Sequence, residues 1–223
     1  MKKVKILRIQ FHEELKNNEI ELFRGAVLSK LQNASVLFHN HIADNFRYAY
    51  PLIQYKRIAK RASIVCLEEG TDVIGQFFSS GDFCFRLGNR EVKMEISTIK
   101  AYQVLVQLWN SSFTYYLHRW LPFNGTNYQE YQALEGIVEQ CAFLEKKLIG
   151  NILSFAKGMG IHFEKEVTCK IIEKEDPYIV VYKGVKMMAF NLVFKTNVSI
   201  PDYIGLGKGV SIGNGVLVRE TKK

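Results

Sequence analysis

A glycine-rich segment near the C-terminus is the most informative stretch of the sequence: Gly205-Leu206-Gly207-Lys208-Gly209-Val210-Ser211-Ile212-Gly213-Asn214-Gly215. Five of its eleven residues are glycine, which tolerates backbone angles forbidden to other residues and lets a ligand approach the main chain. Successive N–H groups in such a turn can bind an anion, and Lys208 adds a positive charge. We therefore predict a phosphate-binding loop, with a tight β-turn carrying bulges as the alternative.

Two better-known phosphate-binding motifs do not fit this segment. A dinucleotide fingerprint needs a following helix and an acidic residue about 20 positions further on. Only eight residues follow Gly215, and Val216-Leu217-Val218 predicts a strand. A P-loop would need Gly-Lys-Ser or Gly-Lys-Thr, whereas Gly207-Lys208 is followed by Gly209.

The hydrophobic pattern of the rest of the chain predicts alternating groups of strands and helices. In the first half we expect strands at 2–11, 46–58, 62–68 and 83–87, and helices at 19–32 and 71–80. In the second half, residues 91–108 are rich in strand formers, a long helix covers much of 127–157, and strands lie near 166–174, 178–182, 185–196 and 215–220.

The order strand, helix, strand, strand, helix, strand in the first half is that of a ferredoxin-like domain, and the second half fits the same order. The predicted class is α+β, with two tandem ferredoxin-like (RRM-like) domains over residues 1–95 and 96–223.

Composition favours a globular protein with a polyanionic partner. Hydrophobic residues make up 48% of the 223 residues, and the formal net charge is +8. No apolar run approaches the roughly 18 residues of a membrane span, so we expect no membrane partner and a cytoplasmic location. The four cysteines form no C-x-x-C pair and are predicted to be buried.

The glycine pattern resembles a known signature. Gly-x-Gly, five residues and Gly-x-Gly at the extreme C-terminus, after Ile200-Pro201-Asp202-Tyr203-Ile204, is similar to that of the CRISPR-associated repeat-cleaving endoribonucleases of the RAMP superfamily. The resemblance implies two ferredoxin-like domains and a loop that packs between them and contacts RNA. It also implies cleavage of precursor CRISPR RNA within its repeats without metal or cofactor. The implied partner is CRISPR repeat RNA, with a homodimer or a CRISPR effector complex as the larger assembly.

A histidine pair follows the first predicted helix in Phe38-His39-Asn40-His41. If this segment is extended, both imidazoles lie on one side of the backbone, because strand side chains alternate. Two histidines can then share acid and base work near neutral pH. With the RNA 2′-hydroxyl as nucleophile, the expected products are a 2′,3′-cyclic phosphate and a 5′-hydroxyl.

The b-type subgroup of the resembled family carries such a pair, together with a nearby tyrosine and lysine. The resemblance implies catalytic roles for His39 and His41, with Tyr48 orienting or donating a proton and Lys30 stabilising charge on the phosphate. Two alternatives remain: a metal site with Asp44 as a third ligand, and a purely structural pair.

A basic set lies at the junction of two predicted strands. It comprises Lys56, Arg57, Lys60 and Arg61. These residues are predicted to follow the RNA backbone, or else to guard a solvated strand edge with charge. The full predicted RNA-binding set adds the loop residues Gly205, Gly207, Lys208, Gly209, Gly213 and Gly215.

Two functions of different classes follow from these features. The first is an endoribonuclease that uses histidine acid/base chemistry without a metal. The second is an RNA-binding subunit of a CRISPR effector complex that does not cleave. A metal-dependent hydrolase using the histidine pair is a weaker third hypothesis.

Overall fold

The structure, a computed structural model, describes residues 2–31, 36–39, 41–42, 45–46, 49–79 and 83–220. At residues 36, 39, 41, 42, 45 and 46 it describes the backbone alone. The chain divides into two compact units. The N-terminal unit comprises Lys3–Val104 together with Ser211–Gly213, and the C-terminal unit comprises Leu105–Val210, the described residues from Asn214 onward and Lys2.

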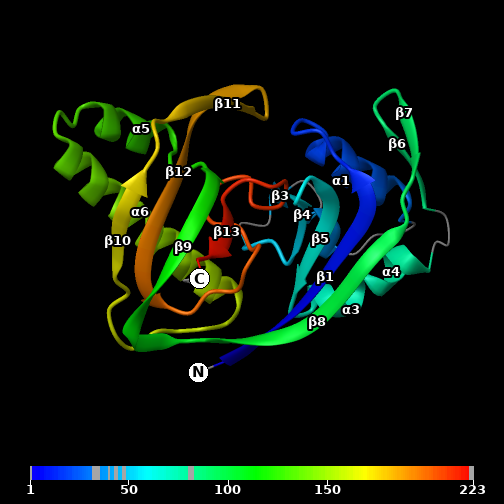
Figure 1. Ribbon diagram of the computed structural model, residues 1–223, viewed down its shortest axis with the longest axis horizontal. Coiled ribbons are helices and arrows are strands. Elements are labelled where there is room, and N and C mark those ends of the chain that lie inside the picture. Colours follow the sequence, from blue (N-terminus) through cyan, green and yellow to red (C-terminus); the bar gives the residue numbers. More distant parts are fainter. Residues whose placement is uncertain are drawn as a thin grey trace. The chain divides into compact units, whose positions relative to one another are not determined.

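The N-terminal unit is built on a four-stranded sheet in the order β4-β5-β1-β8 (Figure 1). Its strands are β1 (Lys2–Glu14), β4 (Ile53–Ile58), β5 (Arg61–Leu67) and β8 (Ile96–Val106). Its helices are α1 (Ile20–Ser29), α2 (Val36–His39), α3 (Gly70–Val73) and α4 (Gly75–Phe78). Two small hairpins complete it: β2 (His41–Ile42) with β3 (Asn45–Phe46), and β6 (Cys84–Leu87) with β7 (Arg90–Lys93).

Aromatic side chains fill the core between this sheet and its helices. Phe23 of α1 meets Phe11 of β1 edge-on at 5.8 Å between ring centroids, and meets Tyr55 of β4 at 5.9 Å. Phe77 of α4 closes the other side of Phe11 at 6.5 Å. The helical spacing of Phe23 and Val27 puts both side chains on the buried face of α1. The predicted helix at 19–32 is therefore confirmed.

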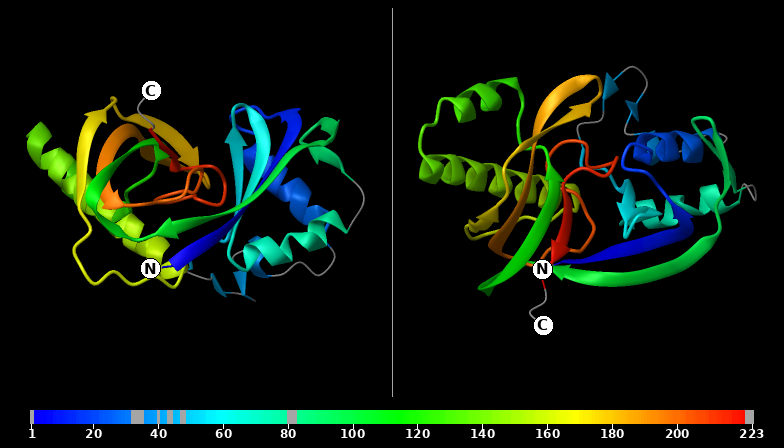
Figure 2. Two further views of the ribbon diagram at one scale, coloured as in Figure 1. Left: turned by 60° about the horizontal axis from the view of Figure 1, so that its bottom comes forward. Right: turned by 45° about the horizontal axis from the view of Figure 1, so that its top comes forward.

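The C-terminal unit has a sheet in the order β10-β12-β9-β13, with β11 paired to β12. Its strands are β9 (Leu108–Trp120), β10 (Cys169–Lys174), β11 (Tyr178–Tyr182), β12 (Val185–Val198) and β13 (Val216–Arg219). Its helices are α5 (Gly125–Gln132) and α6 (Ile137–Gly158). The α6 helix runs along one face of this sheet (Figure 2) and buries Leu144, Leu148, Ile152 and Phe155.

The long helix expected over much of 127–157 is present as α6, but two elements of the second half were not predicted. A separate helix, α5, precedes α6, because Asn124 caps α5 through the Asn127 amide and α6 starts anew after an extended Gly136. Strand β9 extends to Trp120, well past the predicted strand-rich region. Its first half carries the polar run Asn110-Ser111-Ser112, which interrupts the hydrophobic alternation.

The antiparallel sheets and packed helices of both units confirm the α+β class. The predicted domain boundary near residue 95 lies at the start of β8. The two units divide after Val104, because β8 is hydrogen-bonded to β1 in the N-terminal sheet.

Cysteine burial was predicted for all four thiols. It holds for Cys66, whereas Cys141 and Cys169 are half-buried and Cys84 is exposed. Within the described residues, no helix is long and apolar enough to cross a membrane.

Candidate functional site

The glycine-rich loop adopts a backbone that requires glycine at four positions. Gly207, Gly209, Gly213 and Gly215 have φ angles of 87°, 67°, 82° and 62°. These angles lie in the left-handed region that side chains disfavour. A Cβ on Gly215 would lie 1.8 Å from the Leu206 carbonyl oxygen, and one on Gly207 would lie 2.8 Å from the Leu121 oxygen. Packing as well as conformation therefore excludes larger residues.

Backbone hydrogen bonds within the C-terminal unit hold this loop. The Leu206 amide donates to the Gly215 oxygen at 2.8 Å, and the Lys208 amide donates to the Leu121 oxygen at 3.0 Å. The Asn214 amide donates to the Gly209 oxygen at 3.2 Å. These three amides are engaged inside the fold, so phosphate binding by a cradle of main-chain N–H groups gains no support from them. The Lys208 side chain is exposed.

Three residues of the same loop belong to the N-terminal unit and extend its sheet. The Tyr55 amide of β4 donates to the Ser211 oxygen at 2.8 Å, and Tyr55 and Ile212 form a parallel bridge. A Cβ on Gly213 would lie 2.7 Å from Ile20 Cδ1. The alternative expectation of a tight glycine turn is therefore confirmed, and phosphate binding by the loop stays a prediction.

The histidine pair does not lie on an extended segment. His39 is the last residue of α2, and His41 is the first residue of β2, where it pairs with Phe46. The extended segment that the period-two argument requires is therefore not present at His39, and the directions of the two imidazoles stay a prediction. The side chains of both histidines, and the whole of Asp44 and Tyr48, lie outside the described part. Their catalytic and metal-binding roles stay predictions.

Lys30 follows α1 and is half-buried. Its Nζ lies 6.0 Å from the centroid of the Phe85 ring, within reach of a cation–π contact. Its predicted role at the phosphate is untested.

The basic set at the β4–β5 junction does not form one exposed surface. Lys56 is fully buried at 0% exposure, and burial lowers its pKa from 10.5 to about 7. Arg57 is half-buried, and its Nε donates to the Leu15 oxygen at 2.6 Å. Arg61 is also half-buried. Only Lys60 is exposed, in a two-residue turn where Ala59 and Lys60 have φ angles of 48° and 67°.

Both faces of β4 are covered, because Ile53 and Tyr55 on one face and Gln54 and Lys56 on the other are all buried. Lys56 is therefore corrected from a predicted RNA contact to a buried residue. Lys60 remains available to a phosphate.

Sequence reasoning missed an arginine that is bonded to the glycine-rich loop. Arg119 of β9 has a φ of 52°, which costs a non-glycine residue roughly 1–2 kcal/mol. Its Nε donates to Asn214 Oδ1 at 2.8 Å, and its amide donates to Asn191 Oδ1 at 2.9 Å. No sequence signal marks it, since these partners lie 72 and 95 residues away along the chain.

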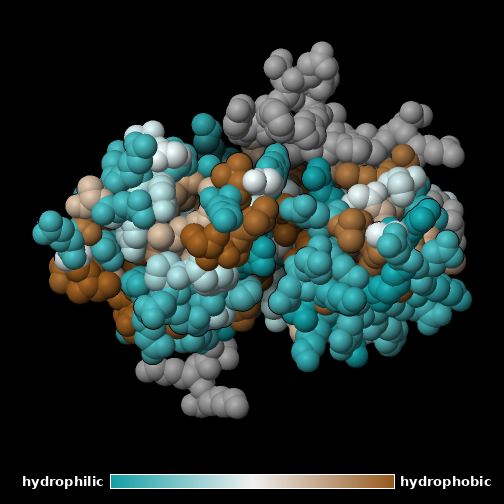
Figure 3. Space-filling model, turned by 90° about the horizontal axis from the view of Figure 1, so that it is seen from above, coloured by the Kyte–Doolittle hydropathy of each residue, from teal (hydrophilic) through white to brown (hydrophobic). Residues whose placement is uncertain are grey.

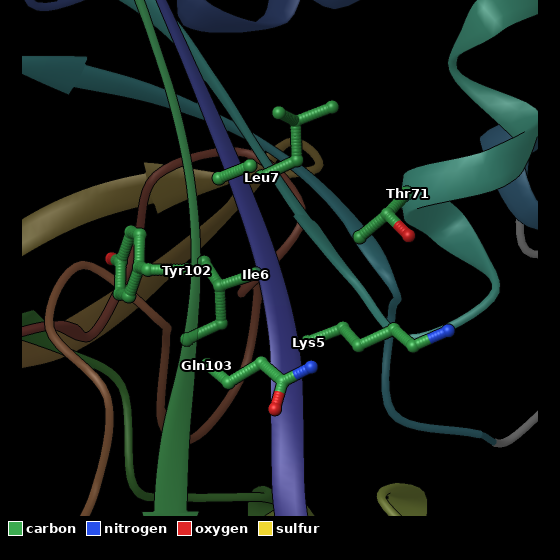
Figure 4. A pocket seen from close by; sticks show the side chains of 7 residues that line it. Lys5, Ile6, Leu7, Thr71, Tyr102 and Gln103 are labelled. Carbon is green, nitrogen blue, oxygen red and sulfur yellow. The ribbon is translucent and has the colours of Figure 1, made fainter.

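A shallow pocket of about 400 Å³ lies in the N-terminal unit, and its lining includes none of the predicted site residues. Its lining comes from β1, α3 and β8: Lys5, Ile6, Leu7, Thr71, Ala101, Tyr102 and Gln103. In Figure 4, Lys5 and Leu7 extend toward Thr71, whereas Tyr102 lies on the other side of β8. Lys5 is its single charged group, so the pocket offers little acid/base chemistry.

A second hollow of about 680 Å³ lies in the C-terminal unit, where Trp109, His162 and Lys165 contribute to its wall. The Trp109 indole N–H donates to Ser199 Oγ at 2.8 Å, which fixes the exposed ring. Among the described side chains, no group of three His, Cys, Asp or Glu residues could hold a metal ion.

Two antiparallel α+β units with a glycine-rich loop before the last strand define a class of tandem ferredoxin-like proteins. The chain is more specifically a member of the Cas6b family. The model of the Cas6b N-terminal domain matches residues 2–104, and that of the Cas6b C-terminal domain matches residues 107–220.

Individual proteins agree with this assignment. The chain is 38% identical over 104 residues to the uncharacterized protein MJ0978 of Methanocaldococcus jannaschii, a match that covers 47% of this chain and 69% of that protein. It superimposes with a TM-score of 0.91 on a structure described as "Crystal structure of Cas6b", at 25% identity, covering 98% of this chain and 100% of the other.

A second structure, "Crystal structure of CRISPR RNA processing endoribonuclease Cas6b", gives a TM-score of 0.76 at 24% identity, with 98% and 100% coverage. These likenesses confirm the predicted fold of two ferredoxin-like domains.

Proposed function

We propose that this protein is a metal-independent endoribonuclease that cleaves precursor CRISPR RNA within its repeats. The observation that carries the proposal is the match of both Cas6b domain models, which together span residues 2–104 and 107–220. One structure of the same fold bears the name of a CRISPR RNA processing endoribonuclease. The net charge of +8 suits an RNA substrate.

The proposed chemistry uses two imidazoles and the RNA's own nucleophile. One histidine of the pair His39 and His41 takes the proton of the 2′-hydroxyl, and the 2′-oxygen attacks the adjacent phosphorus. The bond from phosphorus to the 5′-oxygen breaks, and the other histidine, protonated beforehand, gives its proton to that oxygen. The products are a 2′,3′-cyclic phosphate and a 5′-hydroxyl. Lys30 stabilises the developing phosphate charge and Tyr48 orients the reacting groups.

Exposed cations in both units support binding of the RNA backbone. Lys60 stands in the β4–β5 turn and Lys208 in the glycine-rich loop, each with its side chain open to solvent. Phosphate contacts of this kind supply affinity without reading the base sequence.

The decisive test is cleavage of a labelled repeat RNA by the double variant His39→Ala/His41→Ala, in the presence of chelator. Loss of one acid/base group typically slows a reaction about 10²–10⁴-fold. We therefore expect cleavage to fall at least 10²-fold while RNA affinity stays within a few-fold. His162→Ala is the matched control, since His162 is an exposed histidine of the C-terminal unit, and it should cleave like the wild type.

Three outcomes would contradict the proposal. Full cleavage by the double variant would show that His39 and His41 do not catalyse the reaction. Dependence of the wild type on an added divalent cation would favour a metal-dependent hydrolase. Tight RNA binding without any product would favour a non-cleaving subunit of an effector complex.

A further inference from the structure

A β-bulge in the C-terminal unit sets Arg119 apart from the rest of β9. In the pairing of β9 with β12, Trp120 lies opposite Phe190 and Leu117 lies opposite Leu192. Two residues of β9, His118 and Arg119, therefore face the single residue Asn191. Such a bulge bends the strand and changes the direction of a side chain, and bulges are common beside functional sites.

Arg119 occupies a backbone conformation for which glycine is the usual choice. Its φ of 52° lies in the left-handed region. Strained positions held by a long polar side chain tend to occur where that side chain has a task. The strain at Arg119 therefore makes it a candidate for a functional role in addition to its contact with the loop.

Three hydrogen bonds fix both the backbone and the side chain of Arg119. Its amide donates to Asn191 Oδ1 at 2.9 Å, its carbonyl oxygen accepts from the Gly215 amide at 2.9 Å, and its Nε donates to Asn214 Oδ1 at 2.8 Å. Asn214 is itself buried, at 5% exposure. The guanidinium is thereby held against the glycine-rich loop.

The two Nη groups of this guanidinium make no hydrogen bond to another described residue. Within the described part of the chain, the hydrogen bonds of its side chain use Nε alone, and no carboxylate forms an ion pair with it. The nearest acidic group of the network, Glu175, is bonded instead to Asn191 Nδ2 at 2.8 Å and to the Tyr116 hydroxyl at 3.4 Å. The two Nη groups form the planar fork that matches a phosphate.

Further cations lie on the same loop and next to it. Lys208 is exposed and directly precedes Gly209, where a Cβ would lie 2.9 Å from the Tyr182 ring. Lys183 follows Tyr182 in the β11–β12 turn and is also exposed. Figure 3 views the molecule from the side of β11 and shows hydrophilic residues among hydrophobic patches on that face.

We propose that Arg119 binds a phosphate of the RNA backbone through its two Nη groups, with Lys208 adding charge beside it. Asn191 fixes the backbone of the bulge and Asn214 holds Nε of the guanidinium before the RNA arrives, so little side-chain freedom is lost on binding. The proposal rests on the proposed RNA-processing function. It assigns a phosphate contact to the Arg119 side chain of β9, next to the glycine-rich loop.

The test compares Arg119→Asn, Arg119→Lys and the control Lys146→Gln. Asparagine tolerates the left-handed backbone but lacks the guanidinium, and lysine keeps the charge but loses the fork. Lys146 is an exposed residue of α6, so its variant removes one charge elsewhere in the same unit. The ligand is a fluorescent repeat RNA with a 2′-deoxy nucleotide at the mapped cleavage position, titrated at several salt concentrations.

For Arg119→Asn we expect about tenfold weaker binding and a salt-dependence slope smaller by about 0.7–0.9, the loss of one phosphate contact. Arg119→Lys should keep the slope and bind more weakly, and Lys146→Gln should bind like the wild type. Thermal melting confirms that each variant is folded. Wild-type affinity and slope in Arg119→Asn, or wild-type affinity in Arg119→Lys, would overturn the proposal.

The failure of this inference can be told from failure of the proposed function. If wild type binds and cleaves the repeat RNA while Arg119→Asn behaves identically, only the arginine assignment fails. If wild type shows no salt-sensitive binding of repeat RNA, the RNA-processing function itself fails.

Discussion

Replacing Gly215 by alanine should destabilise the protein far more than the same change at Gly184. Both glycines belong to the C-terminal unit and have similar φ angles, 62° and 77°. A Cβ on Gly184 would meet nothing within 4 Å, whereas one on Gly215 would lie 1.8 Å from the Leu206 oxygen. The pair therefore separates the conformational cost of alanine from the cost of displacing the loop.

The magnitudes follow from these contacts. The left-handed backbone costs alanine roughly 1–2 kcal/mol. Alanine also lowers the conformational entropy of the unfolded chain, which stabilises the fold by about 0.4–1 kcal/mol. Gly184→Ala should therefore lower the free energy of unfolding by about 1 kcal/mol. Displacing the loop at Gly215 also disrupts its hydrogen bonds to Leu206 and Arg119, each worth about 1 kcal/mol. Gly215→Ala should then cost about 3 kcal/mol or more.

Thermal melting by circular dichroism measures the difference. At this chain length about 1 kcal/mol shifts Tm by roughly 2–4 °C, so we expect a loss near 2–4 °C for Gly184→Ala and at least about 6–12 °C for Gly215→Ala. Midpoints within about 2 °C of each other would refute the packing argument for the loop. The glycines would then have to be explained by ligand approach alone.

Two further predictions concern buried polar groups. Lys56→Met should make the protein more stable at pH 7 and remove a rise in stability between pH 7 and 10. In that window the unfolded chain binds a proton at Lys56 that the folded chain, with its lowered pKa, does not. Urea midpoints at pH 7 and 9 measure the change in stability, and Lys60→Met is the exposed control. The same change of midpoint with pH in Lys56→Met and wild type would contradict the prediction. Tyr115→Phe should lower Tm by roughly 4–8 °C. The Ile200 amide donates to the Tyr115 hydroxyl at 2.7 Å, and the loss of this buried partner should lower the free energy of unfolding by about 2 kcal/mol. A Tm within about 1 °C of wild type would contradict this and show that water replaces the hydroxyl.

Regular hydrophobic patterns made much of the fold predictable. The alternation of residues 2–11 and the spacing of Phe23 and Val27 fixed β1 and α1, because each pattern has one period and one buried face. The apolar residues spaced along α6 begin at Leu134, after α5 ends, so this spacing could not predict α5 as a separate helix. The decisive signals were local: a capping Asn124 and an extended Gly136.

The candidate site was less accessible to sequence reasoning, because it depends on direction and burial. The sequence does not distinguish Lys56 from Lys60, yet Lys56 is buried and Lys60 lies exposed in a turn. The position of His39 in a helical turn could not be read from a four-residue motif. Arg119 gains its importance from Asn191 and Asn214, partners that only the folded chain brings together.

The short segment at residues 211–213 has a consequence for the order in which the protein can mature. Translation delivers β4 early, but the neighbour of its Tyr55 comes from residues 211–213, which are translated long after it. Until then β4 is an edge strand with unpaired backbone groups, and such strands can pair with strands of other chains. Prematurely terminated products that stop before Ser211 would keep that edge open permanently, and would be natural targets for chaperones and proteases.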